Sequence, residues 1–156
     1  MTQIRDVMSR DFKWVPPETT LRDAARIMRD NDVGFLPIGE NDRMVGIITD
    51  RDITVRAVAE GFHPQSDTVR SVMTPGPFYC YEDQNVAEIC DNMSFIKVRR
   101  LPVVSRDKRL VGVVSLGDLA QICQKAQTGD ALRQITNHGQ ASQIKAEGKA
   151  DQAKAA

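Results

Sequence analysis

The chain has 156 residues, of which 41% are apolar and 27% are charged, and its 21 basic residues balance its 21 acidic ones. The apolar content is sufficient for a packed core, and the balanced charge excludes an overall field that would attract nucleic acid or an anionic membrane. Because the apolar runs are too short to span a membrane and the N-terminus lacks the apolar segment of a secretory signal, we expect a cytoplasmic protein with no membrane partner.

The first half of the chain alternates helix-like and strand-like patterns. In chain order we predict an extended segment at 13–15, a helix from 21, strands at 33–38 and 44–49, and a helix near 50–60. The first helix follows a capping residue, Thr20, and carries apolar residues at the i, i+3, i+4, i+7 spacing of one helix face, namely Leu21, Ala24, Ala25 and Met28. The segment 44–49 is nearly all apolar, so we expect both faces of this strand to be buried.

The second half repeats this order. We predict an extended segment at 78–81, a helix from 86 with Asn85 as its cap, strands at 98–104 and 110–115, and a helix at 116–124. Matched positions agree in chemical type at a nearly constant offset, as in the pairs Met8 and Met73, Leu36 and Leu101, and Asp52 and Asp118. The chain is therefore a duplication of a strand-helix-strand-strand-helix unit.

The last part of the chain differs in composition from both repeats. From residue 126 it has few large apolar side chains and much Ala, Gln, Lys and Gly. This composition predicts a tail that is disordered or partly helical, with a short helix near 130–136. We divide the chain into a first repeat at 1–61, a second repeat at 62–125 and a polar tail at 126–156.

Cysteine and histidine are too few for a metal centre or a disulfide framework. Cys80, Cys90 and Cys123 are odd in number and lie in apolar patterns, which favours reduced thiols in a core. The histidines are His63 and His138, and no Cys-x-x-Cys pair is present. We therefore predict no metal site.

Each repeat carries the same three phrases in the same order: Val-Met-Ser/Thr, a Leu-Pro strand, and Gly followed by two apolar residues, Thr or Ser, two variable residues and Asp. This set resembles a tandem pair of CBS domains, also called a Bateman module, over residues 4–125. The resemblance implies a mixed α/β (α+β) fold in which two tandem β-α-β-β-α repeats pack with pseudo-twofold symmetry. The chain is similar to the stand-alone bacterial proteins of this family.

The resemblance also implies a function. Members of the family are regulatory or sensor modules that commonly bind adenosine nucleotides such as AMP, ADP or ATP in clefts between the repeats, and many form disc-shaped dimers. Whether S-adenosylmethionine takes the place of the nucleotide here is left open. We therefore expect a homodimer that binds an adenosine nucleotide as a regulatory ligand, requires no cofactor and acts on a protein target that the sequence does not identify.

The repeated last phrase fits two roles. Thr49 with Asp52, and Ser115 with Asp118, have the spacing of a capping box at a helix N-terminus. The same position favours a phosphate, and a carboxylate can accept both hydroxyls of a ribose. In the family the last Asp of this phrase holds the ribose and the Thr or Ser lies near phosphate. The two roles are compatible.

Basic residues near these phrases differ between the repeats. Arg99 and Arg100 precede the second Leu-Pro strand, where family members often carry basic residues that reach a phosphate, and the first repeat has Gly34 at the matched place. Conversely, Arg51 lies inside the last phrase of the first repeat, where the second repeat has Gly117. We call this last phrase, residues 46–52 and 112–118, the exit phrase. We therefore expect the two clefts to be unequal.

An adenine base needs an apolar slot. The candidates are Val15, Pro16, Leu36, Cys80, Tyr81 and Leu101, and for any one of them plain core packing is the favoured explanation.

Three other functions are weighed against ligand binding. The alternative is a non-catalytic scaffold that dimerises and whose clefts are vestigial. An enzyme is not expected, because the chain lacks a nucleophile–His–acid set and a Walker loop, and we assign no catalytic residue. Nucleic-acid binding is not expected from a neutral chain, and its only candidates are Arg99, Arg100, Arg106, Lys108 and Arg109.

Overall fold

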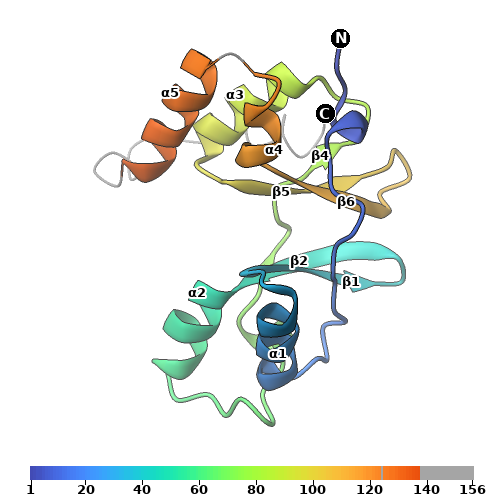
Figure 1. The fold of residues 1–156 in the computed structure, drawn as a ribbon. Helices are drawn as coiled ribbons and strands as arrows, with labels where there is room; N and C mark the ends of the chain where they lie inside the picture. The colour runs from blue at the N-terminus through green and yellow to red at the C-terminus, as the bar shows by residue number, and fades with distance from the viewer. Residues whose placement is uncertain (124, 138–156) are drawn as a thin grey trace. The chain divides into compact units, whose positions relative to one another are not determined.

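The computed structural model describes residues 1–123 and 125–137, which form helices and two three-stranded sheets. The chain divides into two compact units. The contiguous unit is Lys13–Pro77, and the split unit is Met1–Phe12 together with Phe78–Ala156. In each unit the helices lie on one face of the sheet (Figure 1). The predicted mixed helix and sheet fold is confirmed.

The contiguous unit is built around an antiparallel sheet of order β1-β2-β3. Its elements are α1 (Leu21–Asn31), β1 (Phe35–Glu40), β2 (Arg43–Thr49), α2 (Asp50–Asp52), the π-helix η2 (Ile53–Val58), the 3-10 turn η3 (Val69–Ser71) and β3 (Thr74–Pro75). Asn41 and Asp42 join β1 to β2 with φ of 53° and 62°, the left-handed conformation of a tight hairpin turn. The predicted extended segment at 13–15 is reduced to a single parallel bridge from Val15 to Ile38.

The split unit repeats this plan with order β4-β5-β6. Its elements are the 3-10 turn η1 (Ile4–Asp6), β4 (Cys80–Tyr81), α3 (Val86–Ile96), β5 (Arg100–Val104), β6 (Leu110–Ser115), α4 (Leu116–Ala120) and α5 (Lys125–Thr136). β4 pairs with β5 in parallel, and β5 pairs with β6 antiparallel. The predicted helices that begin at Leu21 and Val86 are confirmed with their caps, since Thr20 accepts a hydrogen bond from the Asp23 amide and Asn85 accepts one from the Ala87 amide.

The segment that opens each repeat, residues 4–9 in the first and 69–74 in the second, is here called the leading segment. Each leading segment packs in the unit that holds the strands of the other repeat. Ile4 donates its amide to the carbonyl of Gln84 at 2.9 Å in the split unit. Val69 makes the matched bond to the carbonyl of Thr19 at 2.8 Å in the contiguous unit. From the Val-Met-Ser/Thr phrases themselves, Met8 lies in the core of the split unit and Val72 in that of the contiguous unit.

Three expectations about elements are corrected. The strand at 44–49 is not buried on both faces, because helices cover only one face of the sheet: Ile48 is buried, and Ile47 is partly exposed. The helix expected at 116–124 ends at Ala120. The tail helix is longer than predicted and is packed, because α5 begins at Lys125 and buries Ala131 to 1% exposure. The remainder of the predicted tail, with His138, lies outside the described residues.

Two features are absent from the described residues. None of their helices is long and apolar enough to cross a membrane. They also contain no group of three or more His, Cys, Asp or Glu residues that could hold a metal ion.

Candidate functional site

Both exit phrases form capping boxes, as predicted. In the split unit the Ser115 hydroxyl accepts a hydrogen bond from the Asp118 amide at 3.1 Å, and the Ser115 amide donates to Asp118 Oδ2 at 2.7 Å. In the contiguous unit Thr49 and Asp52 make the same two bonds at 3.1 and 2.9 Å. Each aspartate therefore satisfies a free amide at the start of its own helix.

The second carboxylate oxygens of the two aspartates differ. Asp52 Oδ1 lies 3.7 Å from the Arg56 Nε, one helical turn on, and the Asp52 side chain is 16% exposed. Asp118 Oδ1 has no hydrogen-bond or ion-pair partner within the part of the chain that the structure describes. Asp118, which is half-buried, therefore keeps an acceptor oxygen for another donor.

The split unit brings two of the predicted arginines to the same place. Arg100 is the antiparallel partner of Ser115 in the β5–β6 pair. The carbonyl of Arg99 accepts a hydrogen bond from the Leu116 amide at 2.9 Å, and both arginine side chains are exposed. A cationic strand end thus lies beside the Ser115–Asp118 capping box.

The matched place in the contiguous unit carries an acid that sequence reasoning missed. Asp50 donates its amide to the Gly34 carbonyl at 3.0 Å, and a Cβ on Gly34 would lie 2.7 Å from Asp50 Oδ2. The Asp50 carboxylate therefore occupies the side where the split unit has arginines. Arg51 is exposed and donates its amide to Asp50 Oδ1 at 2.8 Å. The sequence carries a signal for this difference in charge, because Asp50 stands where the second repeat has Leu116.

The residues predicted to line a base slot lie mainly in the two cores. Val15 and Leu36 belong to the core of the contiguous unit, and Cys80 and Leu101 to that of the split unit. Their packing is explained without a ligand, and a contact with a base stays a prediction. Burial raises the pKa of the Cys80 thiol to about 12.

Tyr81 and Pro16 complete this set. Tyr81 is 5% exposed, and the guanidinium of Arg106 lies 4.2 Å from the centre of its ring. The hydrogen bond with Lys108, more than any other contact, lowers the pKa of Tyr81. Pro16 is exposed.

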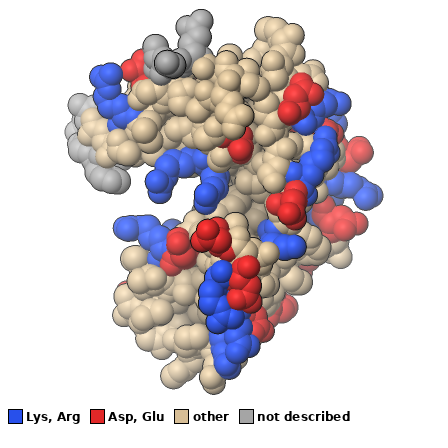
Figure 2. All heavy atoms as spheres, in the orientation of Figure 1, with Lys and Arg blue, Asp and Glu red and all other residues tan. Residues whose placement is uncertain are grey.

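Two of the candidate nucleic-acid contacts are engaged within the split unit. Arg106 binds Asp83 with two nitrogens, Nε at 2.9 Å from Oδ2 and Nη2 at 2.8 Å from Oδ1. The Lys108 ammonium donates to the Tyr79 hydroxyl. On the face shown in Figure 2, basic and acidic side chains lie next to one another in both units, in keeping with the balanced composition.

Comparisons with known proteins agree on one family. A family model described as the CBS domain matches residues 4–58 and 69–125. Hypoxic response protein 1 of Mycobacterium tuberculosis is 38% identical over 122 residues, which are 78% of this chain and 85% of that protein. A crystal structure of Hypoxic Response Protein I with two coordinated zinc ions is 36% identical, with a TM-score of 0.71, and the match covers 79% of this chain and 100% of that one.

Two further structures share the fold. The conserved CBS domain protein TA0289 of unknown function from Thermoplasma acidophilum is 28% identical, with a TM-score of 0.76, over 85% of this chain and 75% of that one. The CBS domain pair of protein MJ0100, in complex with 5′-methylthioadenosine and S-adenosyl-L-methionine, is also 28% identical, with a TM-score of 0.68, over 78% of this chain and 94% of that one.

Proposed function

Because the chain belongs to the CBS domain family, with two copies of the domain in tandem, we propose that it is a non-catalytic regulatory module that binds an adenosine-containing ligand. The observation that carries the proposal is the cluster of Arg99, Arg100, Ser115 and Asp118 at the junction of β6 and α4. Support also comes from the CBS pair of MJ0100, which is in complex with two adenosine compounds.

The split unit supplies groups for both ends of an adenosine nucleotide. Asp118 Oδ1, which no described residue uses, accepts a ribose hydroxyl. The exposed guanidinium groups of Arg99 and Arg100 approach a phosphate, to which arginine can donate two parallel hydrogen bonds. AMP, ADP and ATP all fit this division of roles.

The contiguous unit suits a less anionic ligand. Asp50 places a negative charge beside the Thr49–Asp52 capping box, and a phosphate there would be repelled. The second oxygen of Asp52 already faces Arg56. We therefore propose that this unit prefers an adenosine compound without phosphate, such as 5′-methylthioadenosine or S-adenosylmethionine.

The output of the module is a shift in assembly rather than a chemical step. A ligand shifts an equilibrium only through its different affinities for two states. We propose that those states differ in a homodimer or in the complex with a protein target in the cytoplasm.

Calorimetric titration of AMP, ATP and 5′-methylthioadenosine into variants tests the site. Asp118→Asn should weaken every ligand held by the split unit about tenfold, since the side chain loses its charge and one of its two acceptor oxygens, while the other is needed by the Ser115 amide. Arg100→Gln should weaken AMP and ATP but leave 5′-methylthioadenosine unchanged. Asn85→Ala is the matched control, because it removes a helix cap in the same unit without touching the cluster.

The proposal fails if the wild-type protein gives no binding heat with any of these ligands, or if Asp118→Asn binds them as the wild type does. In that case the better-supported function is the non-catalytic scaffold. One observation favours it, because the capping boxes alone account for Thr49, Asp52, Ser115 and Asp118. Sedimentation of the ligand-free protein would then be expected to show a stable dimer.

A further inference from the structure

Two of the three cysteines pack into the same core of the split unit. Cys90, on the inner face of α3, is fully buried in the core. Cys123 is partly exposed and packs against the same core just after α4 ends. Both cysteines are free, and Cys123 lies near enough to Cys90 to raise the pKa of that thiol.

The surroundings give the two thiols different roles. Burial, followed by contact with Cys123, raises the pKa of Cys90 to about 12, so this thiol is protonated at neutral pH. The Thr128 side chain on α5 also hydrogen-bonds Cys90. Cys123 is the more accessible sulfur and is therefore the one that an oxidant reaches first.

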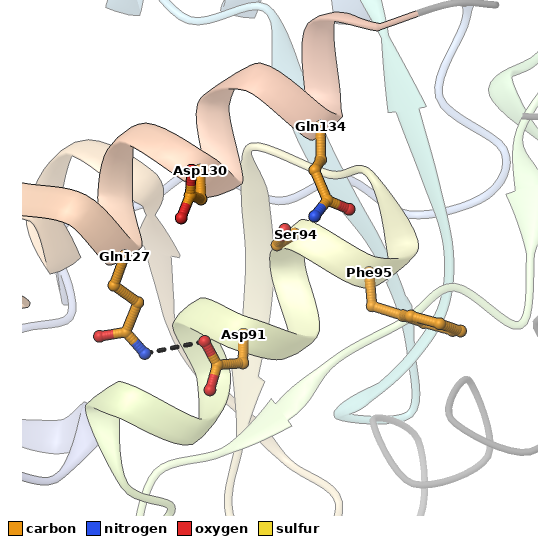
Figure 3. A pocket seen from close by; sticks show the side chains of 6 residues that line it. All are labelled: Asp91, Ser94, Phe95, Gln127, Asp130 and Gln134. Carbon is orange, nitrogen blue, oxygen red and sulfur yellow. Dashed lines mark hydrogen bonds between the residues drawn. The ribbon is translucent and has the colours of Figure 1, made fainter. Parts of the chain in front are cut away.

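Hydrogen bonds fix the segments of the chain in which the two cysteines lie. On one side, the Cys123 amide donates to the Leu119 carbonyl at 2.8 Å, which fixes Cys123 to the last turn of α4. On the other, Gln127 of α5 donates to Asp91 Oδ1 at 2.8 Å across a groove of about 470 Å³ between α3 and α5 (Figure 3). A disulfide would therefore join two cysteines that pack in one core and whose chain segments are already held in place.

We propose that Cys90 and Cys123 are a site of reversible disulfide formation, which fastens the junction of α4 and α5 to α3. The co-reactant is a small disulfide such as oxidised glutathione. The Cys123 thiolate attacks one of its sulfurs, releases one thiolate and forms a mixed disulfide. The Cys90 sulfur, after losing its proton to solvent, displaces the second thiolate. Two protein thiols are oxidised, and the small disulfide is reduced to two thiols.

The bond would act on the helix that carries the proposed ligand site. Ser115 and Asp118 lie at the N-terminus of α4, and Cys123 is anchored to its C-terminal turn. A disulfide at Cys123 therefore restrains α4 and links the redox state to ligand binding. This coupling rests on the proposed function, whereas formation of the disulfide does not.

The test exposes the reduced, folded protein to oxidised glutathione without any nucleotide and then maps its peptides by mass spectrometry under non-reducing conditions. We expect the intact mass to fall by two hydrogens, one linked peptide that joins Cys90 to Cys123, and full reversal by dithiothreitol. After unfolding, iodoacetamide should label only Cys80, which hydrogen-bonds the Pro102 carbonyl and serves as the internal control.

Two variants keep the result interpretable. Cys80→Ser should form the same bond as the wild type. Cys123→Ser replaces the partly exposed thiol, so it should stay folded and leave Cys90 fully alkylatable after the same treatment. The proposal is overturned if Cys90 of the oxidised wild type is still alkylated after unfolding, if Cys123 keeps glutathione as a stable mixed disulfide, or if the linked peptide contains Cys80.

Discussion

Gly46 and Gly112 each face a methionine from the leading segment that packs in the same unit. A Cβ on Gly46 would lie 2.6 Å from Met73 Sδ, and one on Gly112 would lie 2.7 Å from Met8 Sδ. The repeated Val-Gly and Val-Met phrases are therefore the two sides of one packing contact. Packing, and not a ligand, explains the glycine of each exit phrase.

Alanine at either glycine should destabilise its unit by about 1–3 kcal/mol, the usual cost of overpacking. Adding Met73→Ala should recover most of the loss at Gly46→Ala. Met8→Ala should recover less at Gly112→Ala, because the Ser9 carbonyl would lie 2.9 Å from the new carbon, whereas the Thr74 carbonyl would lie 3.1 Å from a carbon on Gly46. Urea denaturation measures the changes, and Gly129→Ala, with no atom within 4 Å, is the control. Wild-type stability of both single variants would contradict the packing account.

The Asp83–Arg106 pair should make stability depend on pH. The hydrogen bonds from Arg106 lower the pKa of Asp83 below its ordinary value. A lowered pKa contributes stability that is present above the unfolded-state value, near 4, and is lost as the pH falls through the folded-state value. Between about pH 6 and pH 3, denaturation curves of Asp83→Asn should therefore shift less than those of the wild type. Equal shifts would show that the pair makes no such contribution.

At the scale of elements, the sequence pattern predicted those features that depend on neighbouring residues alone, such as where a helix begins. The apolar spacing and the caps gave α1 and α3, whose first residues are Leu21 and Val86 as predicted. The length of α5 could not be predicted, because few residues, chiefly Ala131 and Ile135, carry its buried face. The partial exposure of Ile47 depends on which face of the sheet the helices cover, which no strand pattern contains.

The docking of α5 on α3 gives a sharp test. Ala131 is 1% exposed, whereas its neighbour Leu132 is 49% exposed. Ala131→Asp buries a charge and should destabilise the split unit by about 3 kcal/mol or more. Leu132→Asp introduces the same charge on the open face of the same helix and should cost less than about 1 kcal/mol. Thermal unfolding compares them, and similar losses would mean that α5 is not docked as described.

At the scale of the whole molecule, the duplication could be predicted and the exchange of leading segments could not. Matching Ile4 to Val69 shows that the two positions are equivalent, but not which set of strands each contacts. The repeats at 1–61 and 62–125 follow the duplication in the sequence, whereas the compact units follow the packing. The same limit applied to the candidate site: the capping boxes are local and were predicted, while Asp50 beside Gly34 depends on strand pairing.

Because each leading segment packs with the strands of the other repeat, its position predicts which unit responds to a mutation in it. Ile4 and Val69 are both fully buried, but Ile4 lies in the core of the split unit and Val69 in that of the contiguous unit. Ile4→Ala should cost about 2–4 kcal/mol and speed amide exchange in β5 and β6. Val69→Ala should instead speed amide exchange in β1 and β2. Faster amide exchange in β1 and β2 of Ile4→Ala would show that the leading segment does not pack in the split unit.

The central claim is that an adenosine ligand binds where β6 meets α4 in the split unit. An NMR titration of the wild-type protein with AMP tests both binding and location. We expect saturable shifts that are largest for the amides of Arg99, Arg100 and Ser115–Asp118. Spectra that stay unchanged at saturating AMP, or shifts centred on other residues, would contradict the claim.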